Sequence, residues 1–248
     1  MAINRRFTEF RKGRRRSSCM QMTAISVLKW LLYSLGLLLV VAALVPLTVT
    51  WIERRQAHNL QVRHLYVSPV AEQKTRTAVV YFSRSGNTAL VARHVARRLD
   101  ARLFEIQAPA YHLGLQGWAR AMWDARRHEA DISPRTIDLG EFETVYLGAP
   151  IWLYSPASPI WAFVEHNRFD GKRVVLFNTF NSQFKPEYID AFRTKVMERG
   201  ARSFEHKFVC RGRMTQQIDP DEMISAIDSD WIIEDAKPRF DPSSLPSR

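Results

Sequence analysis

The segment from Thr77 to Thr88 constrains the fold more than any other part of the chain. Its first half, Thr77–Phe82, is a run of β-forming residues that stops abruptly in a hydroxyl-rich turn. After Thr88 the apolar residues recur with helical spacing, at Leu90, Val91, Val95 and Leu99. We therefore expect a strand, a tight loop and the start of a helix in direct succession.

The composition of this loop is typical of a turn that binds phosphate. Backbone N–H groups at a helix start carry partial positive charge and suit an anion. Ser83, Ser85 and Thr88 add hydroxyl donors, and Gly86 lets the backbone approach a ligand or adopt positive φ. Because Gly86 is its only glycine, the loop lacks both the Gly-x-Gly-x-x-Gly and the Gly-Lys-Ser/Thr phosphate motifs. A terminal phosphate monoester fits it, and an ordinary turn with a Thr88 helix cap is the simpler alternative.

Positive charge is concentrated at the N-terminus. The formal charge of the 248-residue chain is +11, and residues 1–29 hold +7 of it, with eight basic residues against Glu9 alone. The remaining residues carry only +4, so a nucleic-acid role for the globular part is poorly supported. A basic arm beside an apolar segment is better explained by lipid headgroups.

Residues 30–52 contain no charged side chain and are rich in Leu, Val and Ala. As a helix they would span roughly 34 Å, enough for a bilayer core of about 30 Å. Trp30, Tyr33 and Trp51 lie near the ends, where aromatic rings favour the interface. This pattern predicts a retained single-pass anchor in the cell (inner) membrane, with membrane lipid as a partner through residues 30–52. A cleaved secretory signal is the alternative.

Beyond the anchor, the sequence predicts alternating strands and helices. Residues 53–76 are expected to be a polar connector, 77–232 a folded domain and 233–248 an extended tail. Such alternation favours a parallel sheet with helices on both faces. The expected strands are Thr77–Phe82, Leu103–Gln107, Thr144–Gly148, Arg173–Asn178 and Ser203–Val209. The expected helices are Thr88–Leu99, Leu115–Glu129, Ser158–His166, Pro186–Arg199 and Asp221–Ser229.

Ligands of such sheets bind beyond the carboxyl ends of the strands, so the loops after the third and fourth strands matter too. The loop after the third strand, residues 148–156, carries Trp152 and Tyr154. We expect both rings to be exposed and able to stack on a planar heteroaromatic ligand. Inward packing of Trp152 is the alternative. The second loop, 178–182, is polar with one ring and could flank a ligand edge.

These three loops together resemble the flavodoxin family, above all its bacterial branch with a Tyr-Phe-Ser-Arg-x-Gly-Asn-Thr first loop. The resemblance covers about residues 77–229 and includes the Gly148–Trp152 motif Gly-x-Pro-Ile-Trp. It implies an α/β, doubly wound, five-stranded parallel sheet of order 2-1-3-4-5, here preceded by one N-terminal transmembrane helix. It also implies non-covalent FMN as the cofactor. The implied phosphate site comprises Ser83, Arg84, Ser85, Gly86, Asn87 and Thr88; the implied ring site comprises Pro150, Ile151, Trp152 and Tyr154 on one side and Asn178, Thr179 and Phe180 on the other.

The implied cofactor predicts an FMN-dependent oxidoreductase or electron-transfer domain. The anchor places it at a membrane and motivates the expectation that it passes reducing equivalents from NAD(P)H to a quinone-like acceptor. A flavin-free interaction module of the same fold is the alternative. The helix with Trp118, Met122 and Trp123 would be core or would wall a pocket over the flavin. No catalytic side chain and no metal site are expected. The basic arm favours a cytoplasmic N-terminus, although a cytosolic reductant would favour the opposite orientation.

Overall fold

The computed structural model describes residues 3–63, 75–212 and 217–232. The chain divides into two units, Met1–Val49 and Thr50–Arg248. The expected tail, 233–248, lies outside the described residues, as does the 64–74 part of the expected connector.

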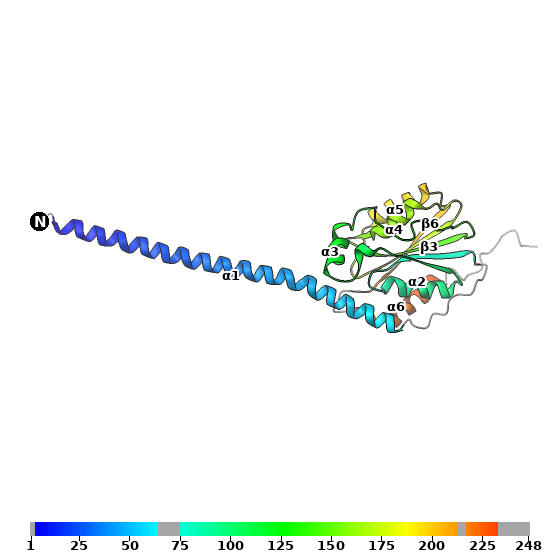
Figure 1. The fold of residues 1–248 in the computed structure, drawn as a ribbon, viewed down its shortest axis with the longest axis horizontal. Coiled ribbons are helices and arrows are strands. Elements are labelled where there is room, and N and C mark those ends of the chain that lie inside the picture. The colour runs from blue at the N-terminus through cyan, green and yellow to red at the C-terminus, as the bar shows by residue number, and fades with distance from the viewer. Residues whose placement is uncertain (1–2, 64–74, 213–216, 233–248) are drawn as a thin grey trace, which may run out of the picture. The chain divides into compact units, whose positions relative to one another are not determined.

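A single helix, α1 (Ile3–Arg63), runs through the basic arm and the apolar segment (Figure 1). The stretch Ser26–Arg55 is long and apolar enough to cross a membrane, a test that a signal sequence also passes. The helix continues past residue 52, so residues 53–63 of the expected connector are helical. Those residues include Glu, Arg, Gln and Leu, which favour helix, and no Gly or Pro to end it.

Five parallel strands form the main sheet in the order β2-β1-β3-β5-β6, which confirms the predicted 2-1-3-4-5 arrangement (Figure 1). The short β4 pairs antiparallel with the end of β3. The strands are β1 (Thr77–Phe82), β2 (Arg102–Ile106), β3 (Thr144–Trp152), β4 (Ser155–Pro156), β5 (Arg173–Phe180) and β6 (Ser203–Cys210).

Helices cover both faces of this sheet because alternate side chains of each strand point to opposite faces. Val79 and Tyr81 of β1 pack in the core beneath α2 and α6, while Val80 and Phe82 belong to the core beneath α4 and α5. The helical elements are α2 (Asn87–Arg98), η1 (Pro109–Tyr111), α3 (Leu115–Trp123), α4 (Ser158–His166), α5 (Pro186–Glu198), α6 (Pro220–Ile227) and η2 (Asp228–Ile232).

The predicted C-terminal ends of one helix and two strands are wrong. Helix α3 ends at Trp123 rather than Glu129, because the buried Asp124 carboxylate pairs with both Arg120 and Arg127 in a turn there. Strand β3 continues past Gly148 to Trp152, and β5 continues past Asn178 to Phe180. The two strand extensions move predicted loop residues into the sheet.

Candidate functional site

The loop after β1 leads into α2 without a side-chain cap on the helix. Gly86 is the N-cap residue and has φ of 91°, a left-handed conformation that glycine adopts without strain. Its N–H donates to Ser83 Oγ at 3.2 Å, which closes the loop. The alternative in which Thr88 caps the helix is therefore wrong, and the first turn of α2 keeps N–H groups that could meet an anion.

Arg84 is buried in this loop and only partly paired. Its side chain is 6% exposed, and one terminal nitrogen pairs with Glu53 of α1. The other donates to the Gly114 carbonyl oxygen at 3.3 Å, whereas Nε has no partner. The side chain therefore retains an open donor beside the helix start.

Unpartnered polar atoms gather around this loop. Asn87 donates through Nδ2 to Ser85 Oγ at 3.2 Å, but its Oδ1 has no partner. Among the described residues, four buried side-chain N or O atoms lack a hydrogen bond, and three of them belong to Glu53, Arg84 and Asn87. Buried polar atoms without partners are rare in folded proteins, and each one calls for an explanation such as a missing ligand or water.

A hydroxyl pair joins the first loop to the end of β5. Thr88 Oγ1 and Thr179 Oγ1 lie 2.8 Å apart, and both residues are buried. Two segments that are far apart in the sequence therefore meet at the carboxyl edge of the sheet, as the topology requires.

Asn178 does not lie in a loop, as predicted, because β5 runs through it. It is fully buried, and its Nδ2 donates to the Ala149 carbonyl oxygen at 2.8 Å. Its Oδ1 lies 2.9 Å from Nε2 of His206 on β6. Burial lowers the pKa of His206 to about 4, so this ring is neutral and donates to Asn178. Asn178 thus has partners for both polar atoms, and no free group points to a ligand.

Phe180 ends β5 and is also buried, with 8% of its surface exposed. Its ring lies 5.5 Å from that of Phe184 and 5.7 Å from that of Phe208. Phe208 on the edge strand β6 remains 48% exposed. Phe180 therefore begins an aromatic cluster that reaches the surface at this edge of the sheet.

Trp152 packs inward, so the prediction that it is exposed is wrong. It is 7% exposed, and its ring lies 5.6 Å from that of Phe82 and 5.0 Å from that of Tyr111. The physical reason is the hairpin from β3 to β4, which continues the strand pairing through Trp152–Ser155. Pro150 and Ile151 on the same strand are half-buried.

The hairpin turn at Leu153 and Tyr154 is strained. Both residues have positive φ, 43° and 77°, at the two central positions of a two-residue turn, where Asn and Gly are preferred. Leu153 is 45% exposed, and Tyr154 is half-buried with Lys185 Nζ 5.7 Å from its ring centre. Strained residues of this kind persist where surrounding structure holds them, often at ligand sites.

The sequence interpretation missed Tyr111 and Asp124. The Tyr111 hydroxyl donates to Asp124 Oδ2 at 3.3 Å, and burial together with that carboxylate raises the pKa of Tyr111 to about 12. Both residues also line an open cleft of about 660 Å³ between α3 and α4. Tyr111 ends the short helix η1 and Asp124 is the C-cap of α3, and no motif in the sequence marked either residue. No cluster of three potential metal ligands occurs in the described parts of the chain.

Comparison with known proteins agrees with this architecture. The sequence model of the flavodoxin family matches residues 76–194. A comparison with curated proteins finds no match. Among solved structures, a protein from Bacteroides uniformis assigned as a flavoprotein is 23% identical, covering 63% of this chain and 99% of its own, with a TM-score of 0.48. A flavoprotein from Lactobacillus acidophilus in complex with FMN is 18% identical, covering 53% and 93%, with a TM-score of 0.44. Flavodoxin 1 from Bacillus cereus is 18% identical, covering 61% and 94%, with a TM-score of 0.38.

The matched region contains the first four strands of the parallel sheet and both ends of the Thr88–Thr179 contact. Sheet order, the loop after β1 and the family match therefore lead to the same assignment. The part of the chain that forms the sheet has a flavodoxin-like fold, and its residues 76–194 match the model of the flavodoxin family.

Proposed function

We propose that the domain binds FMN non-covalently, with the phosphate at the loop after β1. The observation that supports this most strongly is the set of open polar atoms there: Arg84 Nε, Asn87 Oδ1 and the uncapped first turn of α2. Ser83 and Ser85 hydroxyls would complete the phosphate contacts, and Gly86 would allow close approach. A charged guanidinium adds a charge-assisted bond, which is stronger than a neutral one.

In this proposal the isoalloxazine ring lies against the β3–β4 hairpin. Pro150, Ile151 and Tyr154 are half-buried there and can contact a ring directly. Trp152 supports the hairpin from below, and Thr179 and Phe180 border the opposite side. Asn178 holds β5 to β3 and β6 rather than touching the ligand. FMN supplies the redox chemistry, and the protein supplies binding, orientation and electrostatics.

The proposed activity is that of an oxidoreductase or electron-transfer domain tethered to a membrane by the apolar stretch of α1. NAD(P)H is the proposed donor and a quinone-like molecule the proposed acceptor, because an anchored domain meets acceptors that dissolve in lipid. The near-even charge of the remainder of the chain, +4 of the total +11, argues against the strongly acidic surface that suits a soluble electron carrier.

An absorption spectrum of the full-length protein in detergent tests the cofactor. We expect a flavin band in the visible, or its appearance when FMN is added to the flavin-free protein. Titration with riboflavin is the matched control, since it lacks only the phosphate; we expect it to bind at least about tenfold more weakly. Protein that neither carries nor takes up FMN would support the flavin-free interaction module instead.

Three further measurements test the tether, the orientation of the domain and its redox partners. Flotation of the chain with membrane vesicles after alkaline washing tests retention of the anchor, and a reporter fused after Arg248 gives the side of the domain. Oxidation of NADH or NADPH by the reconstituted protein, with and without a quinone in the vesicle, tests donor and acceptor. Oxidation that is independent of quinone would contradict the proposed acceptor.

A further inference from the structure

The side of helix α3 that packs against the rest of the domain is formed by its smallest residues. Within Leu115–Trp123 only Gly117 and Ala121 are buried. Gly117 cannot be replaced without movement, because a Cβ there would lie 1.9 Å from the His112 carbonyl oxygen. Close backbone contact through these two residues therefore sets the orientation of the helix.

Two large apolar residues of α3 face away from the core. Leu115 is 46% exposed and Trp123 is 74% exposed. Together with the exposed Ala119 they stand at positions i, i+4 and i+8, so they share one face of the helix. Met122, beside this face, is half-buried and packs against the core. The interpretation of Trp123 as core is therefore wrong. This apolar face reverses the usual amphipathic pattern and needs a partner.

The N-terminus of α3 contacts the last turn of the candidate membrane span. A Cβ at Gly114, the N-cap of α3, would lie 2.9 Å from Arg54 Nη2. The Gly114 carbonyl oxygen also accepts from Arg84, which pairs with Glu53. Glu53 and Arg54 belong to the apolar stretch Ser26–Arg55 and to the same unit as α3. The exposed face thus begins where the span would leave the lipid.

Charge around α3 also suits a lipid surface. Arg120, Arg126 and Arg127 are exposed, and the buried Asp124 pairs with Arg120 and Arg127. The exposed acidic residues Glu129 and Asp131 follow in the chain, after the end of the helix. Arg55 lies beside Trp51, with its guanidinium 5.6 Å from the ring centre, at the end of the span. Tryptophan with flanking arginine is the combination that favours the interface of an anionic membrane.

We propose that α3 is a second membrane contact: its face formed by Leu115, Ala119 and Trp123 lies in the headgroup region of an anionic bilayer. The inference rests on the membrane tether of the proposed function. With the tether and α3 both at the surface, the carboxyl edge of the sheet is held at the lipid, within reach of an acceptor dissolved there.

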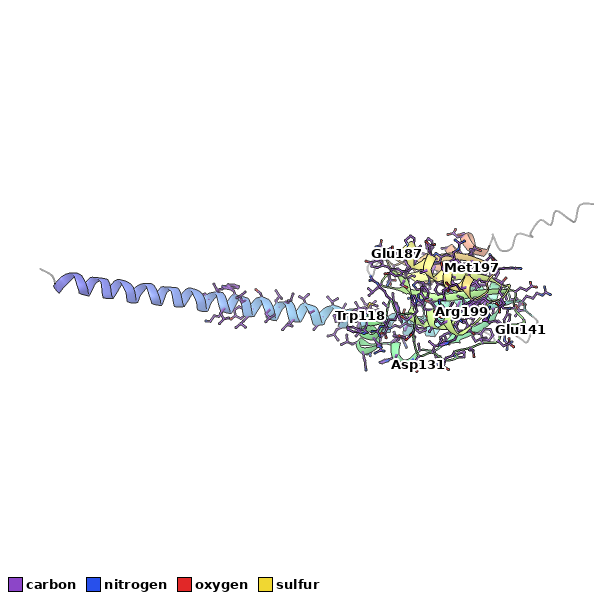
Figure 2. All side chains as sticks on the ribbon, turned by 90° about the horizontal axis from the view of Figure 1, so that it is seen from above. Trp118, Asp131, Glu141, Glu187, Met197 and Arg199 are labelled. Atoms are coloured by element: carbon purple, nitrogen blue, oxygen red, sulfur yellow. The ribbon has the colours of Figure 1, made fainter. Side chains whose placement is uncertain are left out.

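A fluorescent probe tests this contact in the full-length chain. Cys19 and Cys210 are replaced by serine, and Ala119→Cys carries an environment-sensitive label that leaves Trp123 in place. The protein is reconstituted in vesicles of equal parts phosphatidylcholine and phosphatidylglycerol that contain a phospholipid spin-labelled near the headgroup. Glu141→Cys is the control, because Glu141 is exposed and lies at the end of the domain opposite Trp118 of α3 (Figure 2).

We expect the spin-labelled lipid to quench the probe at 119 and to leave the probe at 141 unquenched. Adding Leu115→Glu and Trp123→Glu to the Ala119→Cys protein should abolish quenching while the chain still floats with the vesicles. Equal quenching at 119 and 141 in floating protein would overturn the contact, as would disulfide cross-linking between two copies of the unlabelled Ala119→Cys protein. Protein that does not float would overturn the tether and the contact together. FMN binding is measured independently from the flavin absorption band. Failure of the cofactor proposal can therefore be distinguished from failure of the tether or of the α3 contact.

Discussion

The first loop and the end of β5 both bury polar side chains, but they use them differently. At the first loop, Arg84 and Asn87 each leave one polar atom without a partner. At the end of β5, Asn178 uses its amide nitrogen for Ala149 and its amide oxygen for His206. The resemblance assigned all three residues to one ligand site, whereas the contacts divide them into two groups.

This difference in hydrogen bonding indicates which polar residues are available to a ligand. A buried group that is already satisfied gains nothing from a ligand and contributes to folding, while an unsatisfied one carries a penalty that a ligand can remove. Substitutions at the first loop should therefore change FMN affinity without unfolding the domain. Substitutions at Asn178 and His206 should do the reverse.

The largest expected effect is the loss of FMN affinity when Ser85 is replaced. Replacing it with Glu puts a negative charge where the phosphate would bind, so we expect the FMN affinity to fall at least about a hundredfold, or roughly 3 kcal/mol. Fluorescence titration with FMN measures this change. Ser182→Glu, in the exposed loop after β5, is the control and should bind FMN normally. Equal losses in both variants would contradict the assignment of the phosphate to the first loop.

Asn178→Leu should destabilise the domain by about 2–3 kcal/mol, because the Ala149 carbonyl and the His206 ring both lose their partner inside the core. Denaturant unfolding measures the change, and Asn181→Leu, at an exposed position in the loop after β5, should stay within about 0.5 kcal/mol of the wild type. FMN affinity of the folded protein should be unchanged. A large loss of affinity at full stability would mean that Asn178 touches the ligand after all.

His206 should make stability depend on pH. Its pKa is about 4 in the folded protein, below the ordinary histidine value of 6.5, so the unfolded chain binds more protons between these two pH values. The stabilising contribution is complete above pH 6.5 and is lost as the pH falls toward 4. Between about pH 7.5 and pH 5 the loss should be about 2 kcal/mol. His206→Gln, which can still donate to Asn178, should lose less free energy of unfolding over the same range; an identical pH dependence would rule out His206 as its source.

The smallest expected effect concerns Glu53. Its carboxylate pairs with Arg84 beside the proposed phosphate, so Glu53→Gln should remove a competing negative charge. We expect FMN to bind about threefold to tenfold more tightly, or roughly 1 kcal/mol. Glu143→Gln, which alters a surface pair with Arg76, should leave the affinity unchanged. Weaker binding in Glu53→Gln would show that Glu53 positions Arg84 rather than competing for it.

Much of the fold follows from the sequence, because the signals are local. The run Thr77–Phe82 and the helix Ser158–His166 match the structure at both ends. The other strands of the parallel sheet and the other α-helices of the domain were expected in the right order, whereas the short elements β4, η1 and η2 were not expected. The sheet order follows from the family resemblance. Errors lie at the ends of β3, β5 and α3, where a neighbouring strand or a buried ion pair decides the boundary.

The candidate site divides in the same way. The sequence by itself determined the strand–loop–helix around Gly86, since composition and spacing suffice to predict a left-handed glycine before a helix. Only the tertiary structure decided that Trp152 packs under Phe82, that Asn178 meets His206 and that Arg84 meets Glu53. A sequence pattern tells which residues are apolar or polar, but partners distant in the chain determine which of them are covered and which are satisfied. For the same reason α3 could look like core in the sequence and yet expose Trp123 in the fold.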